Sequence, residues 1–302
     1  MPSEPLSGPP WTILKLLRWT ANYFQERIPE NPRMEAEILL AHALGCRRLD
    51  LYLHHDQPLE EDELTRFRNL VKRRANREPA AYILGYKEFW SLPMQVTPEV
   101  LIPRPDTECL VETVLDTLKK QPHTGQGRLL EPGVGSGAVS IALAKERPEL
   151  NILASDLNPG AVAVAKRNAR RHHLDRRIQF FVGHWLDPLR PDTPLFDFIV
   201  SNPPYIPTAE LDQLAPEITS HEPVRALDGG PDGMQCITAL IRSASVFLKP
   251  GGYLVLEMGC DQKSRVEAVV NGCPQYSEMD FRKDYAGHHR VVRLRKSEHD
   301  HS

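Results

Sequence analysis

The sequence is poor in cysteine, and no two cysteines are spaced as a metal-binding or redox pair. The five cysteines are odd in number and scattered over 302 residues, with no CxxC motif and no histidines at the spacing of metal ligands. This excludes a small disulfide-stabilised fold. We therefore expect free thiols, no bound metal and a reducing compartment, which indicates a cytoplasmic protein.

Long hydrophobic runs and an excess of basic charge are also missing. No stretch of 18 apolar residues occurs, and the N-terminus lacks the pattern of a signal peptide. The net charge of -3 argues against a general nucleic-acid binder. We expect a soluble protein without membrane contact or a direct nucleic-acid substrate. The basic clusters 72–74 and 166–171 are expected on solvent-exposed helix faces, with a local phosphate contact as the alternative.

The first part of the chain has helical periodicity. Apolar residues recur every three or four positions between 11 and 77, with prolines and a glycine between the runs. We predict an all-helical domain at 1–78. Short β-prone runs at 82–84, 89–90 and 94–96, broken by Gly85 and Pro93, predict a β-hairpin linker at 79–104.

The remainder, 105–302, alternates strands and helices, which predicts an α/β domain with a parallel sheet covered on both faces. A helix from about Thr107 to Lys120 should be capped by Asp106. The later β-prone runs at 277–281 and 290–294 lack a helix between them and should form an antiparallel pair at the sheet edge. The other predicted elements are strands at 128–131, 151–156, 178–182, 196–201 and 252–258, and helices at 138–145, 159–171, 233–247 and 262–270.

A glycine-rich turn, Gly133-Val134-Gly135-Ser136-Gly137, joins the first of these strands to its helix. Glycines allow a backbone to approach a ligand closely at this end of a parallel strand. Asp156 ends the next strand, 19 residues beyond Gly137, where a carboxylate can accept hydrogen bonds from both hydroxyls of a ribose. Asn158 before Pro159 should cap the following helix, which leaves Asp156 for a ligand. The pair predicts a nucleoside site, although a plain turn and an NAD site remain alternatives.

A second motif, Asn202-Pro203-Pro204-Tyr205, follows an apolar strand and should lie on the same sheet edge. The Asn202 side-chain carbonyl and the Pro203 backbone carbonyl can accept the hydrogens of a planar NH₂ group, which localises the nitrogen lone pair. Tyr205 can cover the planar group. The chemistry is typical of methyl transfer to an amide or amino nitrogen without a general base, and the local alternative is a proline-rich turn.

With these motifs and three further segments, the chain resembles the HemK/PrmC family of release-factor glutamine methyltransferases over nearly its whole length. The further segments are LIPRPDTE at 101–108, Glu222-Pro223 and Ala226-Leu227. The resemblance implies a class I, Rossmann-like methyltransferase domain behind a helical substrate-recognition domain. It also implies methyl transfer from S-adenosylmethionine, leaving S-adenosylhomocysteine, to the glutamine amide of the Gly-Gly-Gln motif in class I peptide chain release factors.

The resemblance also assigns roles to residues. It implies that Asn202, Pro203 and Tyr205 are catalytic and that, with Pro204, they bind the substrate glutamine. The chain departs from the family at Glu131-Pro132, where Asp-Leu is usual, and at His184, where an acid is usual. The residues that it implies for cofactor binding are Glu131, Gly133, Val134, Gly135, Ser136, Gly137, Asp156, Trp185 and Asn202, with Arg104, Pro105 and Thr107 bordering the cofactor.

Two other functions remain open from the sequence. One is an N6-adenine nucleic-acid methyltransferase, which would need base flipping and a basic binding surface. The other is a non-catalytic partner-binding protein of the same fold. The adjacent pairs His172-His173 and His288-His289 are expected at the surface, because neighbouring side chains on a helix or strand point in different directions.

Overall fold

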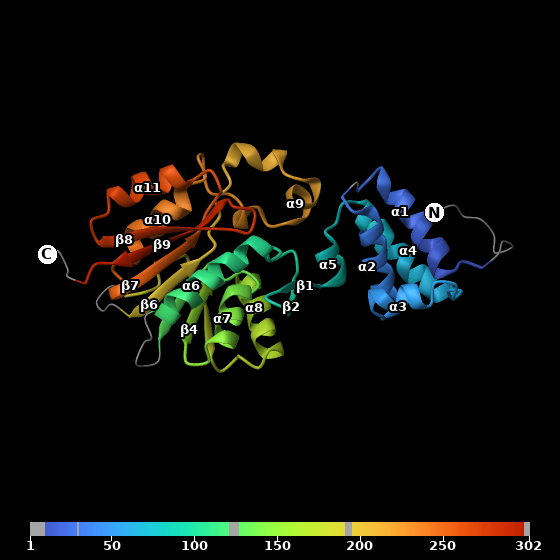
Figure 1. The fold of residues 1–302 in the computed structure, drawn as a ribbon, viewed down its shortest axis with the longest axis horizontal. Helices are drawn as coiled ribbons and strands as arrows, with labels where there is room; N and C mark the ends of the chain where they lie inside the picture. Colours follow the sequence, from blue (N-terminus) through green and yellow to red (C-terminus); the bar gives the residue numbers. More distant parts are fainter. Residues whose placement is uncertain (1–9, 29, 121–126, 191–194, 299–302) are drawn as a thin grey trace. The chain divides into compact units, whose positions relative to one another are not determined.

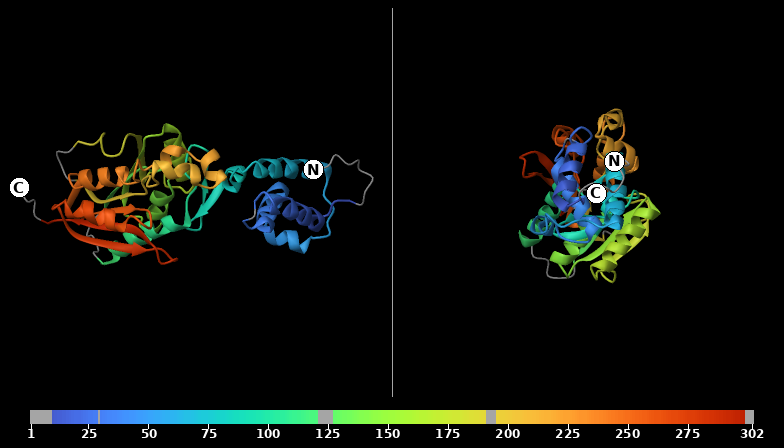
Figure 2. Two further views of the ribbon diagram at one scale, coloured as in Figure 1. Left: turned by 90° about the horizontal axis from the view of Figure 1, so that it is seen from above. Right: turned by 90° about the vertical axis from the view of Figure 1, so that its right-hand side faces the viewer.

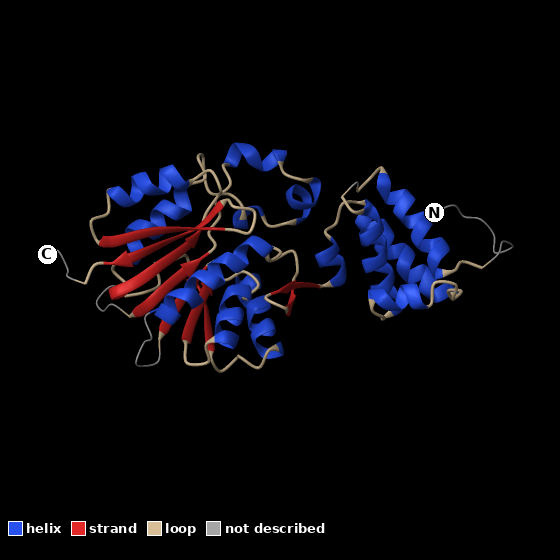
Figure 3. Cartoon of the chain, viewed as in Figure 1, coloured by secondary structure: helices blue, strands red, loops and turns tan. Residues whose placement is uncertain are grey.

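A computed structural model describes residues 10–28, 30–120, 127–190 and 195–298. The chain divides into two compact units. The first comprises Met1–Gly85 and Ala215–His221, and the second comprises Tyr86–Leu214 and Glu222–Ser302. Figure 3 shows helices throughout the described part of the first unit, whereas the strands lie in the second.

The first unit is built from helices, and those of the first 85 residues surround one apolar core. Thr12 caps α1 by accepting a hydrogen bond from the Lys15 N–H, and Gly45 ends α2 in the left-handed conformation at φ 64°. Leu16, Phe24 and Phe67 are fully buried, and burial of each such side chain contributes about 1.5–3 kcal/mol. The helices are α1 (Ile13–Gln25), α2 (Pro32–Leu44), α3 (Arg48–Leu53), α4 (Glu61–Ala75), α5 (Ala80–Leu84) and α9 (Pro216–His221).

The β-prone run at 82–84 was wrongly predicted, because these residues lie in the short helix α5. Gly85 ends the helix at φ 80°, and the side chains of Tyr82 and Ile83 are buried. A run of three apolar residues has no periodicity that separates a strand from a single helical turn. The burial of these side chains in the tertiary structure therefore decided that the segment is a helix and not a strand.

The hairpin that follows consists of β1 (Tyr86–Phe89) and β2 (Leu92–Gln95), paired antiparallel with Phe89 opposite Leu92. Its two-residue turn, Trp90-Ser91, has positive φ at both positions, 53° and 55°, as a primed hairpin turn requires. The Trp90 N–H donates to Glu108 Oε1 over 2.8 Å, which helps to hold a conformation that non-glycine residues seldom adopt.

The second unit contains a sheet that, within the described residues, has seven strands in the order β5-β4-β3-β6-β7-β9-β8. All neighbouring pairs are parallel except those of β9, which is antiparallel to β7 and to β8. This confirms the predicted α/β fold and its antiparallel pair at the edge. The strands are β3 (Arg128–Pro132), β4 (Asn151–Asp156), β5 (Ile178–Val182), β6 (Phe196–Ser201), β7 (Leu248–Glu257), β8 (Tyr276–Lys283) and β9 (His289–Lys296).

Helices cover both faces of this sheet and form a separate apolar core on each face (Figures 1 and 2). One face carries α6 (Glu108–Lys120), α7 (Ala138–Glu146) and α8 (Pro159–Arg171), and the other carries α10 (Gln235–Ala244) and α11 (Lys263–Asn271). Because the strand order reverses between β3 and β6, the carboxyl ends of these strands leave a crevice of the kind that binds ligands in open α/β sheets. Short 3₁₀ turns, η1 (Pro105–Thr107), η2 (Thr208–Gln213) and η3 (Val224–Ala226), lie in the loops.

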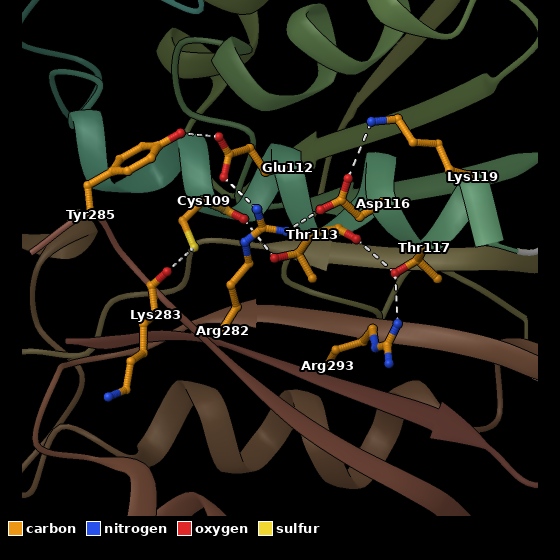
Figure 4. A network of polar contacts seen from close by, with 10 residues as sticks. All are labelled: Cys109, Glu112, Thr113, Asp116, Thr117, Lys119, Arg282, Lys283, Tyr285 and Arg293. Atoms are coloured by element: carbon orange, nitrogen blue, oxygen red, sulfur yellow. Dashed lines mark hydrogen bonds and ion pairs between the residues drawn. The ribbon is translucent and has the colours of Figure 1, made fainter. Parts of the chain in front are cut away.

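Polar contacts fasten α6 to the edge strands, as Figure 4 shows. Arg282 of β8 donates to Glu112 Oε2 over 2.7 Å and to Asp116 Oδ2 over 2.6 Å. Arg293 of β9 donates to the Thr117 hydroxyl over 3.1 Å. These contacts join residues more than 160 positions apart and hold α6, which follows the LIPRPDTE segment in the sequence, against β8 and β9.

The predicted cap at Asp106 was wrong. Asp106 lies inside η1, which precedes α6, and its carboxylate forms an ion pair with Arg290 of β9 at 3.1 Å. Pro105 starts the 3₁₀ turn because its fixed φ suits the first position of a helical turn. The side chain of Asp106 is thus directed to the sheet edge and not to the helix N-terminus.

Two basic side chains that we expected at the surface are buried. His172 ends α8 with its Nε2 atom 3.1 Å from the Pro93 carbonyl, and burial lowers the pKa of its imidazole. Arg74 of α4 donates to Glu35 Oε2 over 2.9 Å and to Glu217 Oε1 over 3.1 Å. Glu217 belongs to the segment 215–221, which packs with the first unit although the flanking residues belong to the second. All five cysteines are free thiols, as predicted.

Candidate active site

A cavity of about 260 Å³ opens at the carboxyl ends of β3, β4 and β6, within the second unit. Both predicted motifs contribute to it, although they are more than 60 residues apart in the sequence. The predicted site residues that line the cavity are Glu131, Gly133, Val134, Gly135, Ser136, Asp156, Trp185, Asn202 and Pro204.

The glycine turn takes its shape from backbone conformations that favour glycine. Gly133 and Gly135 have φ of 76° and 51°. A Cβ atom on Gly133 would lie 3.2 Å from the ring of Trp185, so a larger residue would press against the indole. The Val134 N–H donates to the Ser155 carbonyl over 2.8 Å, which ties the turn to the end of β4.

Asp156 holds the turn from the end of β4. Its Oδ2 atom accepts the Gly135 N–H and its Oδ1 atom accepts the Asn158 N–H, both over 2.9 Å. Burial raises the pKa of this carboxyl. Each carboxylate oxygen has a second lone pair, so Asp156 can also accept hydrogen bonds from a ligand in the cavity.

Asn158 caps α8 as predicted, since its Oδ1 atom accepts the Gly160 N–H over 3.0 Å. Gly137 was expected to bind the cofactor, but it does not line the cavity. It is the N-cap of α7 at φ 84°, and an added Cβ would lie 3.2 Å from both Ala165 and Ile141. Gly137 therefore permits α7 and α8 to pack closely.

Glu131 is a buried carboxyl at the base of the turn. Its Oε2 atom accepts the Ser140 N–H over 2.9 Å and also the Ser140 hydroxyl, near the N-terminus of α7. Burial raises the pKa of Glu131 to about 8, against these hydrogen bonds. A cation bound beside Glu131 would favour its ionised form, so the residue suits an ammonium ligand.

Asn202 follows β6 and lines the cavity. Its Nδ2 atom donates to the Thr107 hydroxyl over 3.1 Å, which leaves Oδ1 as the available acceptor of the amide. Pro204 lines the same cavity, whereas Pro203 and Tyr205 do not. The Tyr205 hydroxyl instead donates to Glu257 Oε1 over 3.2 Å.

Trp185 and His184 border the cavity beyond the end of β5. Trp185 has φ 44°, and its ring lies against Gly133. The His184 Nδ1 atom lies 2.8 Å from Asp187 Oδ2, so this imidazole already has a polar partner. Of the residues expected to border a cofactor, Arg104 and Thr107 line the cavity and Pro105 does not.

The sequence analysis missed the structural role of two buried acids, Glu222 and Glu257. Glu222 accepts the Ile102 N–H over 3.1 Å and Arg104 Nη2 over 2.6 Å, and so holds the LIPRPDTE segment beside the cavity. Glu257 ends β7 and accepts a hydrogen bond from the Tyr205 hydroxyl. A charged residue directly after the apolar run 253–256 was the signal that could have identified Glu257.

The sheet order, the antiparallel strand β9 next to the edge strand β8 and this crevice define a class I methyltransferase fold. Two family profiles match the chain: "PrmC N-terminal domain" over residues 15–85 and "Methyltransferase small domain" over residues 107–233.

Curated relatives identify the family. The "Release factor glutamine methyltransferase" of Geobacter sulfurreducens is 47% identical over 256 residues, covering 85% of this chain and 87% of the relative. That of Rhodopirellula baltica is 39% identical over 298 residues, covering 98% and 100%. The chain belongs to the release factor glutamine methyltransferase family.

Solved structures agree on the fold. The hMettl16 catalytic domain in complex with MAT2A 3'UTR hairpin 6 superposes with a TM-score of 0.55 at 14% identity, covering 77% of this chain and 83% of that one. At this identity the likeness concerns the fold alone. In the part of the chain that the structure describes, no helix is long and apolar enough to cross a membrane.

Proposed function

We propose that this protein transfers a methyl group from S-adenosylmethionine to the side-chain amide nitrogen of the glutamine in the Gly-Gly-Gln motif of class I peptide chain release factors. The relatives at 47% and 39% identity carry the name of that activity. The observation that carries the proposal is the Asn202 amide, which contacts the Thr107 hydroxyl through Nδ2, while Oδ1 accepts no hydrogen bond from the described residues and can accept a substrate N–H.

The cavity suits S-adenosylmethionine by the chemistry of its lining. Glu131 offers a carboxyl for the ammonium group, and Asp156 offers acceptors for the ribose hydroxyls. The glycine turn gives the open backbone that a bulky ligand needs, and Trp185 provides an aromatic face for adenine stacking. When bound, this cofactor supplies a methyl group on a positively charged sulfur.

The chain's part in the reaction is to prepare the amide nitrogen. An amide nitrogen is a poor nucleophile because its lone pair is delocalised into the carbonyl group. Hydrogen bonds from the NH₂ group to Asn202 Oδ1 and to the Pro203 carbonyl would localise that pair and direct it to the methyl carbon. The nitrogen–carbon bond forms as the carbon–sulfur bond breaks, the electron pair of that bond stays on sulfur, and the nitrogen then loses a proton to solvent.

We assign recognition of the release factor to the helical domain, placed at 1–78 from the sequence, with the hairpin linker and the catalytic domain at 79–104 and 105–302. Support comes from the profile match at 15–85 and from three apolar side chains on α3 that are more than half exposed. Exposed apolar side chains that cluster on one helix are typical of protein interfaces. These side chains are Leu49, Tyr52 and Leu53, at 61%, 53% and 64% exposure. Action on release factors places the protein in the cytoplasm.

Methyl transfer can be tested with purified protein, labelled S-adenosylmethionine and a release factor. Label and a one-methyl mass increase are expected on the release factor, but not on a variant in which the Gly-Gly-Gln glutamine is replaced. Labelling of DNA instead would favour an adenine methyltransferase. No transfer to either substrate, with intact cofactor binding, would favour a non-catalytic partner-binding protein.

The role of Asn202 can be tested separately. Asn202→Ala should lower kcat about 100-fold, the size of effect seen when a transition-state hydrogen bond of about 2.7 kcal/mol is removed. The affinity for S-adenosylmethionine should change much less. Asn271→Ala, at the exposed end of α11, is the matched control. An unchanged kcat in Asn202→Ala would remove this residue from the mechanism.

A further inference from the structure

Gln262 is a buried amide side chain that the proposed reaction does not use directly. It is the N-cap residue of α11, lies five positions after Glu257 at the end of β7, and is 1% exposed. It does not line the cavity. An amide has two hydrogens to donate and an oxygen that accepts, and leaving these groups unpaired in the interior costs free energy. Its hydrogen-bond partners therefore determine what it holds in place.

The Gln262 side chain joins three separate segments by hydrogen bonds. Its Nε2 atom donates to the Tyr205 carbonyl over 2.9 Å and to the Gly233 carbonyl over 3.1 Å. Its Oε1 atom accepts the Gly259 N–H over 2.8 Å. Carbonyl groups only accept and a backbone N–H only donates, so these partners allow a single orientation of the amide. Gln262 thus ties the Asn-Pro-Pro-Tyr loop and the loop 228–233 to the chain that follows β7.

The loop that contains Gly229 and Gly233 lies against the backbone of Tyr205. A Cβ atom on Gly229 would lie 2.7 Å from Tyr205 Cα, and one on Gly233 would overlap the Tyr205 carbonyl oxygen. The Ile206 N–H donates to the Leu227 carbonyl over 3.0 Å, and the Gly229 N–H donates to the Ile206 carbonyl over 2.8 Å. The backbone that leaves the Asn-Pro-Pro-Tyr motif is therefore packed directly on the second loop.

Both loops border the cavity, the first through Pro204 and the second through Asp228. The Pro203 carbonyl, which the proposed function uses as an acceptor, lies two positions before the carbonyl that Gln262 holds. Pro204 lies between them, and its fixed φ removes one of the few backbone torsions that could absorb a movement of Tyr205. A displacement of the Tyr205 carbonyl therefore also displaces the acceptor that faces the substrate.

We infer that Gln262 is a positioning residue for methyl transfer, which holds the Tyr205 carbonyl and so places the Pro203 carbonyl where it accepts a hydrogen of the substrate amide. Its loss should lower kcat and leave cofactor binding intact, because Asp156 and the glycine turn are held by other contacts. This inference rests on the proposed function for the role of Pro203. The hold on the two loops can be measured without catalysis.

Gln262→Met keeps the size and burial of the side chain but removes its three hydrogen bonds. We expect kcat for a release factor to fall about tenfold or more, because a small misplacement of reacting groups can cost about 100-fold. The Kd of S-adenosylmethionine should stay within about threefold of the wild-type value. Gln179→Met, at an exposed position of β5, is the matched control. An unchanged kcat, or a Kd that rises as much as kcat falls, would overturn the inference.

Gln262→Glu makes the same contacts depend on pH. The protonated carboxyl still accepts the Gly259 N–H and has one hydrogen to donate to a carbonyl, whereas the ionised form turns lone pairs toward two carbonyl oxygens. Burial beside these carbonyls should raise the pKa of the new carboxyl, so kcat relative to the wild type should be highest in acid. The inference fails if Gln262→Glu is no more active than Gln262→Met at about pH 6, where a carboxyl with a raised pKa keeps its proton.

Gly233→Ala disturbs the same carbonyl from the other loop. Because the added Cβ would overlap the Tyr205 carbonyl oxygen, kcat should fall at least as far as in Gln262→Met. Gly287→Ala is the matched control. Gly233 and Gly287 have φ of 73° and 86°, so both variants carry the strain of a left-handed alanine, but nothing lies within 4 Å of a Cβ on Gly287. An equal loss of kcat in the two variants would attribute the effect to strain and refute the inference.

Hydrogen exchange followed by mass spectrometry tests the hold on the loops without turnover. In Gln262→Met the Ile206 and Gly229 N–H groups should exchange faster than in the wild type, while the glycine turn 133–137 should exchange at its wild-type rate. Unchanged exchange at Ile206 and Gly229, or equally faster exchange in the glycine turn, would contradict the positioning role. Lack of methyl transfer by the wild-type protein would instead refute the proposed function and leave the exchange rates to decide the inference.

Discussion

Replacing Asp156 by asparagine should weaken cofactor binding almost as much as replacing it by alanine. In the structure both carboxylate oxygens already accept a backbone N–H, from Gly135 and from Asn158, each over 2.9 Å. Asparagine offers one oxygen and one NH₂ group, so its nitrogen would meet one of these N–H donors. The substitution therefore disturbs the glycine turn and removes the charge that ribose hydroxyls would contact.

The size of the effect follows from the number of hydrogen bonds. A hydrogen bond to a charged group contributes about 1.5–3 kcal/mol, and two ribose hydroxyls at the lower figure give about 3 kcal/mol. That corresponds to a Kd roughly 100-fold higher or more, since each 1.4 kcal/mol is a factor of ten. Asp156→Ala should also lower the free energy of unfolding by about 1–3 kcal/mol, because the Gly135 N–H loses its partner.

Isothermal titration with S-adenosylmethionine measures the affinity, and urea unfolding without cofactor measures the stability. Asp175→Asn, at an exposed position, is the matched control. If the Kd of Asp156→Asn for the cofactor were within threefold of the wild-type Kd, the idea that this carboxylate both holds the glycine turn and binds the ribose would be refuted. A loss confined to stability, with unchanged Kd, would show that Asp156 supports the turn but does not contact the ligand.

Three further predictions concern buried or partly buried charges. Burial raises the pKa of Glu131 to about 8, so its protonated form stabilises the fold below about pH 4.5 and this stability is lost as the pH rises to about 8. As the pH rises from 5 to 9, the urea midpoint of the wild type should therefore fall relative to that of Glu131→Gln. A difference between the two midpoints that does not change with pH would contradict the raised pKa of Glu131. Glu222→Gln should lower the free energy of unfolding by about 2 kcal/mol, because it removes the charge that the Arg104 guanidinium faces; calorimetry showing no change in Tm would refute this. Arg282→Ala should cost only about 1 kcal/mol, since its ion pairs are partly exposed, and a loss above about 3 kcal/mol would show that they are stronger than surface pairs.

Most of the regular structure was predictable because its causes are local. The strands at 151–156, 178–182 and 196–201 and the helix at 159–171 agree with the structure to the residue. The strands are short apolar runs, and the helix has apolar residues at helical spacing after its Asn158 cap. These signals act within a few positions. The glycine turn and Asp156 were found from the sequence for the same reason.

Long-range contacts decided what the sequence left open. The sequence shows Arg74 only as part of a basic cluster, which we expected at the surface. In the structure its guanidinium is buried and donates hydrogen bonds to Glu35 and Glu217. Gly137 looks like a ligand-binding glycine until α8 is packed against it.

The sequence by itself determined the fold class, the glycine turn that predicts a nucleoside site and the Asn-Pro-Pro-Tyr motif. Only the tertiary structure showed what holds that motif, because Thr107, Asn202 and Glu257 are 95 and 55 positions apart along the chain. Burial creates the demand for hydrogen-bond partners, and folding selects which distant side chains meet it. The contacts that hold the Asn-Pro-Pro-Tyr motif are therefore a property of the folded domain and not of the motif itself.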